Sequence, residues 1–163
     1  MGNKALFLDR DGVVNMDTGY VHNIDDFVFV EGIFELCLKF QDNGYLIIIV
    51  TNQSGIGRGL FTEEDFKVLN DWMVEQFKER GVHIDKVYYS KALPTEHCFR
   101  RKPNPGMLLE ARNEFQLRLD QSVLVGDKPT DIMAAKYAGI KFHFKIKTNA
   151  KVDMDHLWDM VHS

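Results

Sequence analysis

Three apolar runs constrain the fold of this chain more than any other feature. They are "KALFLD" at residues 4–9, "YLIIIVT" at 45–51 and "SVLVGD" at 122–127. Each run is almost continuously apolar instead of alternating, which is typical of strands that are covered on both faces. Two weaker strand candidates lie at residues 86–90 and 140–144. The pattern predicts a sheet buried between two layers.

Helical patterns lie between these runs. Apolar residues spaced i, i+3, i+4 and i+7 from Ile33 predict a helix that stops at Gly44. A second helix begins after Thr62, which can form a capping box with Asp65, and it stops at Gly81.

Proline at the first helical position predicts two more helices, from Pro105 and from Pro129, and Gly139 ends the latter. Strands that alternate with helices indicate parallel βαβ units. We therefore expect an α/β fold, a doubly wound and mostly parallel sheet with helices on both faces, in a single domain over residues 1–163.

The composition is that of a globular chain of 163 residues, with 45% hydrophobic and 27% charged residues. A net charge of −4 argues against a general binder of nucleic acid or anionic membranes. The start lacks a signal-peptide pattern, and no apolar run reaches the ~20 residues of a membrane span. Two cysteines exclude a disulfide framework. We expect a cytoplasmic monomer that binds neither nucleic acid nor membrane. Any anionic ligand must be bound by a small local cluster of basic residues.

Two aspartates, Asp9 and Asp11, follow the first run, and Asp127 ends the third. The carboxyl ends of parallel strands meet at one edge, so we expect these carboxylates to lie together. They repel one another unless a cation lies between them, and hard oxygen ligands suit Mg²⁺. The alternative is that Asp9 and Asp11 only cap a turn, which the third acid makes weaker. We expect the Arg10 side chain to point away from the two carboxylates. Asp131 can lie in the first turn of a helix, which is a favourable place for a carboxylate, and its direct role in the site stays open.

Two further motifs carry groups that suit an anion. In "VTNQSGIGRG", Thr51 ends a strand and a glycine-rich loop follows, although the motif fits neither a Walker A loop nor a dinucleotide fingerprint. In "FRRKPNPGM", Arg101 and Lys102 precede a helix. One interpretation is that both motifs bind a phosphate. The alternative is that the first motif is only a flexible loop and that the cations of the second are only a solvated surface.

The order of these motifs resembles the haloacid dehalogenase superfamily of aspartate-nucleophile phosphatases. More narrowly, "FLDRDGVVN", "DTGYVH", "TNQSGIGRG", "RKPNPGM" and "VGDKPTD" resemble the D-glycero-D-manno-heptose 1,7-bisphosphate phosphatase family, which is close to histidinol-phosphate phosphatase domains. The resemblance extends to about Gly139.

The resemblance implies a role for each matching residue. Asp9 would be the nucleophile and Asp11 the general acid/base. Thr51 and Lys102 would bind the transferring phosphoryl group. Mg²⁺ would be held by Asp9, by the backbone carbonyl of Asp11 and by Asp127. The positions that match substrate-contacting residues are Asp17, Thr18, Gly19, Tyr20, Asn52, Gln53, Ser54, Gly55, Arg101 and Lys128. Residues 17–20 would form a flap, because the chain after Asp11 is too short for a large cap domain.

The chain departs from the family in the loop after the third strand. Many members hold this loop with a structural zinc, bound by Cys-x-His and Cys-x-Cys pairs. These pairs align with Ser90 and Ala92, and with Cys98 and Arg100, so one of four ligands is kept. We expect no structural zinc, because such sites are closed and tetrahedral.

The leading hypothesis is a Mg²⁺-dependent phosphatase that acts through a phosphoaspartyl intermediate on a small phosphorylated metabolite. The sharpest form names the 7-phosphate of D-glycero-D-manno-heptose 1,7-bisphosphate, with histidinol phosphate or another sugar phosphate as the alternative. A phospho-receiver signalling domain is the alternative from a non-enzyme class, but it requires an acid where this chain has "YYS" at residues 88–90. A silent relative, a phosphomutase and a nucleic-acid end phosphatase stay open.

Overall fold

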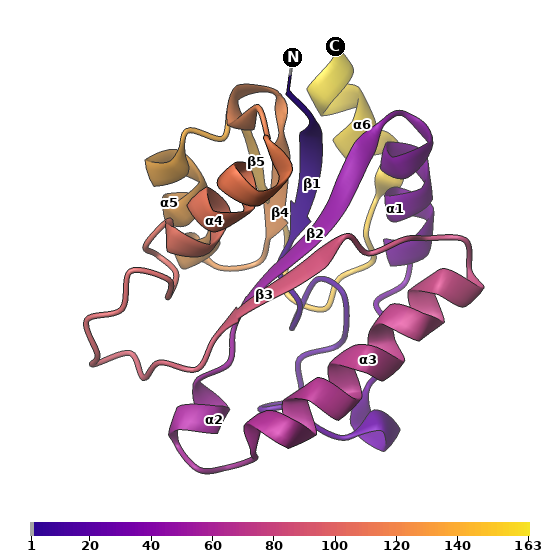
Figure 1. Ribbon diagram of the computed structural model, residues 1–163. Coiled ribbons are helices and arrows are strands. Elements are labelled where there is room, and N and C mark those ends of the chain that lie inside the picture. The colour runs from indigo at the N-terminus through magenta and orange to yellow at the C-terminus, as the bar shows by residue number, and fades with distance from the viewer. Residues whose placement is uncertain (1) are drawn as a thin grey trace.

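All five runs expected to be strands form one sheet in the computed structural model, which describes residues 2–163 (Figure 1). Every strand pairing in it is parallel, and the strand order is β3-β2-β1-β4-β5. The strands are β1 Lys4–Leu8, β2 Tyr45–Asn52, β3 Lys86–Ser90, β4 Val123–Gly126 and β5 Phe142–Lys145. The predicted doubly wound α/β fold is confirmed.

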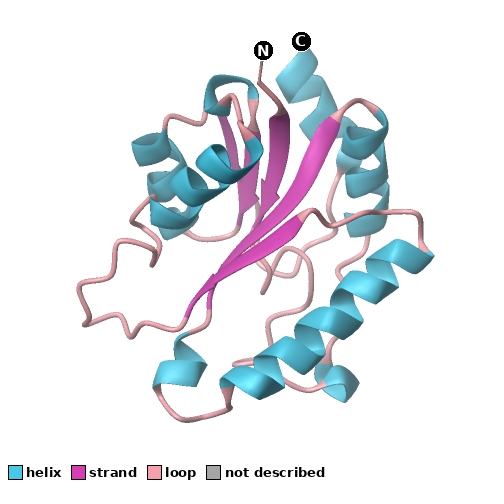
Figure 2. Ribbon diagram, in the orientation of Figure 1, coloured by secondary structure: helices cyan, strands magenta, loops and turns pink. Residues whose placement is uncertain are grey.

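Helices cover both faces of this sheet (Figure 2). Figure 1 shows α4 and α5 over one face and α1, α3 and α6 over the other. The helices are α1 Ile33–Asp42, α2 Ser54–Gly57, α3 Glu63–Glu79, α4 Gly106–Phe115, α5 Pro129–Ala138 and α6 Met154–His162, with 3-10 turns η1 Ile24–Asp26 and η2 Leu119–Gln121. Between β1 and α1 the chain forms only η1 and short loops, so this segment carries no cap domain. No helix within residues 2–163 is both long and apolar enough to cross a membrane.

Two hydrophobic cores explain why the strand runs are continuously apolar. In β1, Leu6 and Leu8 face the core shared with α1, α3 and α6, whereas Ala5 and Phe7 face the core shared with α4 and α5. Successive side chains of a strand point to opposite faces of the sheet. Because both faces are buried here, the residues that point to either face must be apolar.

The helix boundaries follow the predicted signals. Thr62 and Asp65 form the reciprocal capping box at the start of α3, with the Asp65 backbone N–H donating to Thr62 Oγ1 at 3.0 Å. Helix α5 begins at Pro129 and ends at Gly139, whose φ of 88° lies in the left-handed region. The predicted start of α4 is wrong by one residue, because Pro105 is the N-cap and the helix begins at Gly106.

The capping box gives a test of the start of α3. Thr62→Ala removes the side-chain acceptor of an otherwise unpaired helix N–H, so we expect the free energy of unfolding to fall by about 1 kcal/mol. Thr62→Ser keeps the hydroxyl oxygen and is the matched control. Urea denaturation of both variants measures the difference, and equal midpoints would contradict the capping role.

Candidate active site

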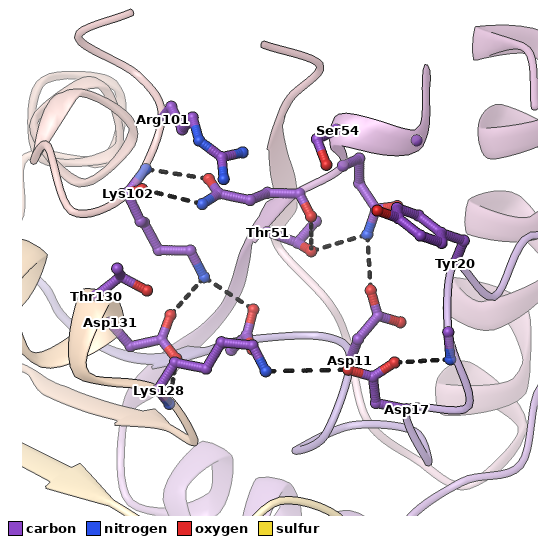
Figure 3. Close-up of a pocket in the computed structure, with 15 residues that line it drawn as sticks. Asp11, Asp17, Tyr20, Thr51, Ser54, Arg101, Lys102, Lys128, Thr130 and Asp131 are labelled. Carbon is purple, nitrogen blue, oxygen red and sulfur yellow. Dashed lines mark hydrogen bonds and ion pairs between the residues drawn. The ribbon is translucent and has the colours of Figure 1, made fainter. Parts of the chain in front are cut away.

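The predicted site residues converge at the carboxyl ends of β1, β2 and β4, around a cavity of about 420 Å³ (Figure 3). Asp9 follows β1, Thr51 lies in the last part of β2, and Asp127 follows β4. The strand order reverses between β1 and β4, which is where open α/β sheets bind their ligands.

Most residues predicted from the sequence line this cavity. They are Asp9, Asp11, Asp17, Gly19, Tyr20, Thr51, Asn52, Gln53, Ser54, Gly55, Arg101, Lys102 and Lys128. Two predicted residues lie outside its lining: Thr18 is exposed in the flap, and Asp127 is buried next to it. Thr130 and Asp131 also line the cavity, although they were not among the predicted site residues.

Three buried carboxylates, of Asp9, Asp127 and Asp131, offer oxygens that lie within 4.8 Å of one another. Asp131 is already engaged, because one oxygen accepts from the Lys102 ammonium and the other from the backbone N–H groups of Asp127 and Lys128. Asp127 differs, since its Oδ1 is buried without a hydrogen-bond partner. A free oxygen on Asp127 beside Asp9 is the hard-ligand arrangement that suits Mg²⁺. The donor set therefore fits this ion, with Asp131 as its support.

Gly12 lets Asp127 approach the loop after β1. A Cβ atom at Gly12 would lie 2.2 Å from Asp127 Oδ2, and its φ of 96° disfavours any side chain. Thr148 Oγ1 donates to the same Oδ2 at 2.7 Å. The carboxylate of Asp127 is thus fixed by a contact from the segment that follows β5.

Lys102 is buried between two carboxylates. Its Nζ donates to Asp9 Oδ1 at 2.8 Å, to Asp131 Oδ1 at 2.6 Å and to the Val50 carbonyl at 2.9 Å. The Asn52 amide holds the lysine backbone, because it accepts from the Lys102 N–H and donates to the Lys102 carbonyl, each at 3.0 Å. All three ammonium hydrogens are satisfied in this arrangement.

Burial and neighbouring charges set the proton affinities here. Burial lowers the pKa of Lys102, but the carboxylates of Asp9 and Asp131 outweigh this effect and raise that pKa above its ordinary value. Burial raises the pKa of Asp9 well above its ordinary value, and Asp131 and Asp127 add to the rise against the lowering effect of Lys102. Among the described residues, the three buried carboxylates meet only the buried Lys102 and the half-exposed Lys128, whose Nζ lies 3.4 Å from Asp127 Oδ2. A divalent cation would supply the remaining positive charge.

Asp11 has a donor shell of its own, and here the expectation that Arg10 points away is wrong. Arg10 is 1% exposed and folds back onto its neighbour, with Nη2 at 2.9 Å and Nε at 3.1 Å from Asp11 Oδ1. The Asn15 amide also donates to Oδ1, whereas Oδ2 accepts from Gln53 Nε2 at 3.0 Å. The Arg10 guanidinium also donates to the Val21 carbonyl. These acceptors offset the cost of burying its charge.

The flap formed by residues 17–20 lies over the cavity opposite Lys128 (Figure 3). Asp17 Oδ1 accepts from the Gly19 N–H at 3.0 Å, and Lys128 Nζ lies 3.9 Å from Asp17 Oδ2. Gly19 and Tyr20 both have positive φ, 97° and 50°. The turn brings the half-exposed Tyr20 ring to the cavity mouth.

The loop after β3 directs Arg101 to the cavity wall. Arg101 Nη1 donates to the Ala92 carbonyl at 3.1 Å, while Arg100 Nη1 donates to the Tyr89 carbonyl at 2.7 Å. Cys98 Sγ lies 3.7 Å from Ser90 Oγ. These contacts describe how the loop is held, and the expectation of no structural zinc stays a prediction.

Several residues of the site were missed from the sequence. Asp131 was predicted in part: its expected place in the first turn of a helix is confirmed, whereas its part in the site was left open. Arg10 gave no signal beyond its position between two acids. Asn149 lies 132 residues from its partner Asp17, and Thr148 lies 21 residues from its partner Asp127, so no local pattern links either residue to the site.

Comparison with known proteins gives one family. A model described as haloacid dehalogenase-like hydrolase matches residues 67–145. The chain is 52% identical to the D-glycero-alpha-D-manno-heptose-1,7-bisphosphate 7-phosphatase of Burkholderia mallei, over 86% of this chain and 78% of that protein. It is 45% identical to the corresponding beta-anomer enzyme of Vibrio cholerae, over 93% of this chain and 86% of the relative.

Solved structures agree with this. The D,D-heptose 1,7-bisphosphate phosphatase of B. bronchiseptica, in complex with magnesium and phosphate, superimposes with a TM-score of 0.87 at 25% identity and 98% coverage of both chains. A HAD-like phosphatase from Mesorhizobium loti gives a TM-score of 0.84 at 32% identity, over 99% of this chain and 85% of that one.

The buried lysine gives a test of the site's stability. Lys102→Met leaves Asp9 and Asp131 buried without their counter-ion, so we expect the free energy of unfolding to fall by about 3–5 kcal/mol in Mg²⁺-free buffer at neutral pH. Urea denaturation followed by circular dichroism measures it.

Lys86→Met is the matched control, because Lys86 pairs with Glu114 at the surface and both side chains are more than 40% exposed. A much smaller loss is expected there. Equal losses for the two variants would show that the Lys102 ion pairs do not support the fold.

Proposed function

The chain belongs to the heptose-1,7-bisphosphate 7-phosphatase family of haloacid dehalogenase-like hydrolases, and from this membership we propose that it removes the 7-phosphate of D-glycero-D-manno-heptose 1,7-bisphosphate. The reaction is a phosphoric monoester hydrolysis that depends on Mg²⁺. One observation carries the proposal: Asp9, held 2.8 Å from the Lys102 ammonium, shares a cavity with Asp11. We place the enzyme in the cytoplasm as a single-domain monomer that needs no nucleic-acid or membrane partner.

Asp9 is the nucleophile in this proposal. Its carboxylate attacks phosphorus, and the ester bond to the sugar breaks as the phosphoaspartyl bond forms. An anion must approach another anion in this step. Lys102 offsets the repulsion and keeps the attacking carboxylate in place, while Thr51 at the end of β2 binds a phosphoryl oxygen.

Asp9, the Asp11 carbonyl and Asp127 would hold Mg²⁺, which would supply positive charge to neutralise the phosphoryl oxygens. This assignment gives the buried Asp127 Oδ1 its partner. Asp131 does not hold the ion in this proposal. It supports the residues around the ion, because it accepts hydrogen bonds from the Asp127 backbone N–H and from the Lys102 ammonium.

Asp11 carries the proton between the two halves of the reaction. Three donor groups on two side chains occupy its Oδ1, whereas Oδ2 meets only the Gln53 amide among the hydrogen bonds of the described residues. Oδ2 is therefore the atom that protonates the leaving sugar oxygen. The same atom then takes a proton from the water that hydrolyses the phosphoaspartate, which returns Asp9 and releases phosphate.

A second phosphate on the substrate requires positive charge away from Asp9. Arg101 lines the cavity from the loop before α4, as Figure 3 shows, whereas Lys128 lies beside the acidic cluster, 3.4 Å from Asp127 Oδ2. No carboxylate within residues 2–163 forms an ion pair with Arg101, whose guanidinium is thus free to take a phosphate in a bidentate contact. A sugar bisphosphate suits this arrangement better than a monophosphate does.

The proposal is tested by phosphate release from both anomers of the heptose bisphosphate and from histidinol phosphate, with Mg²⁺ and with EDTA. We expect Mg²⁺-dependent turnover of at least one heptose anomer at a higher kcat/KM than that of histidinol phosphate. No release from either anomer would overturn the substrate assignment.

Asp9→Asn tests the nucleophile. The amide cannot attack phosphorus, so we expect kcat to fall more than about a thousandfold, or ~4 kcal/mol in the activation barrier. Asp120→Asn, a change at an exposed surface pair, is the matched control and should keep full activity. Residual activity of Asp9→Asn above a tenth of the wild-type rate would exclude the nucleophilic role.

Asp11→Asn tests the proton carrier separately. The loss of general acid/base catalysis should slow turnover by about 10²–10⁴-fold. The slower second step should let phosphate accumulate on Asp9, which mass spectrometry of the acid-quenched protein detects. A variant with normal turnover would mean that another group carries the proton.

A further inference from the structure

The connection between β5 and α6 passes under the carboxyl ends of the strands, beside the loop that follows β1 (Figure 1). It is anchored at both ends. The Ile146 N–H donates to the Gly126 carbonyl and the Val152 N–H donates to the Glu31 carbonyl, each at 2.8 Å. Residues 147–150 between these anchors, which we call the crossing segment, therefore have a fixed place next to the site.

Asn149 of the crossing segment holds the flap by its backbone. The Asp17 N–H donates to Asn149 Oδ1 at 2.6 Å, and Asn149 Nδ2 donates to the Asp17 carbonyl at 3.2 Å. One side chain thus pairs with both polar groups of a single peptide residue, as a neighbouring strand would. Asn149 itself donates its backbone N–H to the Gly12 carbonyl at 3.0 Å, in the loop that carries Asp9 and Asp11.

The backbone of Asn149 suits this task. Its φ is 65°, in the left-handed region where asparagine is several-fold enriched among residues other than glycine. Asn149 does not line the cavity, whereas Asp17, Gly19 and Tyr20 of the flap do. Any effect of the Asn149 side chain on substrate therefore acts through the flap, because both of its hydrogen bonds go to Asp17.

We propose that Asn149 is a positioning residue that fixes the flap over the cavity and so sets the affinity for the part of the substrate beyond the transferred phosphoryl group. The proposal rests on the proposed function, because it concerns how that same site selects its substrate. Fixing Asp17 places its Oδ1 for the Gly19 N–H and its Oδ2 near Lys128. Tyr20 then stands at the cavity mouth, where the sugar of a bound bisphosphate would lie.

Asn149→Gly isolates this role. Glycine adopts a φ of 65° without strain and keeps the N–H that donates to Gly12, so only the two side-chain hydrogen bonds to Asp17 are lost. Asn43→Gly is the matched control, because the Asn43 side chain also donates to a backbone carbonyl, that of Lys39, but at the end of α1.

The kinetic readout compares two substrates. We expect KM for the heptose bisphosphate to rise about tenfold with kcat within twofold, since a flap ordered for a smaller fraction of the time binds more weakly. p-Nitrophenyl phosphate is too small to need the flap, and its kcat/KM should stay within twofold. A parallel loss on both substrates would overturn the positioning role and indicate general destabilisation.

A second readout does not depend on activity. Amide hydrogen exchange of the peptide over residues 16–22, followed by mass spectrometry, should become at least tenfold faster in Asn149→Gly and unchanged in Asn43→Gly. Unchanged exchange would overturn the proposal. If the wild type failed to hydrolyse either heptose anomer, the proposed function would fall, while this exchange measurement would still decide whether Asn149 fixes the flap.

Discussion

The ammonium of Lys102 connects three parts of the structure that are far apart in sequence. It donates to Asp9 after β1, to the Val50 carbonyl in β2 and to Asp131 in α5. A buried ion of this kind is costly unless every hydrogen finds an acceptor, and here each one does. The requirement works in both directions, since Asp9 can be buried as a carboxylate only where a positive charge meets it. The position of Asp9, the proposed nucleophile, and the position of the lysine loop are therefore set together.

The sheet supplies the rigidity that this ion network needs. Each strand that ends at the site is buried on both faces, so the two cores hold its end against movement in either direction. Loops then bring the remaining groups to that edge, from β2, from the segment before α4 and from the flap. A site assembled from loops on a fixed edge allows small changes in a loop to alter the substrate while the attacking carboxylate stays in place.

Local signals made much of this predictable from the sequence. Continuous apolar runs identified the strands, the Thr62–Asp65 pair identified the start of α3, and the rule that parallel strands end at one edge gathered Asp9 and Asp127. Arg10 was predicted wrongly because its partners include the Val21 carbonyl and two aromatic rings, which only the folded chain brings near it. Thr148 and Asn149 were missed for the same reason, since the hydrogen bond from Thr148 to Asp127 spans 21 residues and the one between Asn149 and Asp17 spans 132 residues.

The buried Arg10 gives the two aspartates of "FLDRD" unlike surroundings. Asp9 meets a lysine and two further carboxylates, which is an environment for an attacking group beside a cation. Asp11 instead has one oxygen saturated by Arg10 and Asn15 and the other turned toward Gln53 at the cavity. A carboxylate fixed through one oxygen cannot rotate to offer both, so only Oδ2 of Asp11 is available for the proposed proton transfer. Two residues of the same type, two positions apart, thus suit the different roles proposed for them, because Arg10 separates their hydrogen-bond networks.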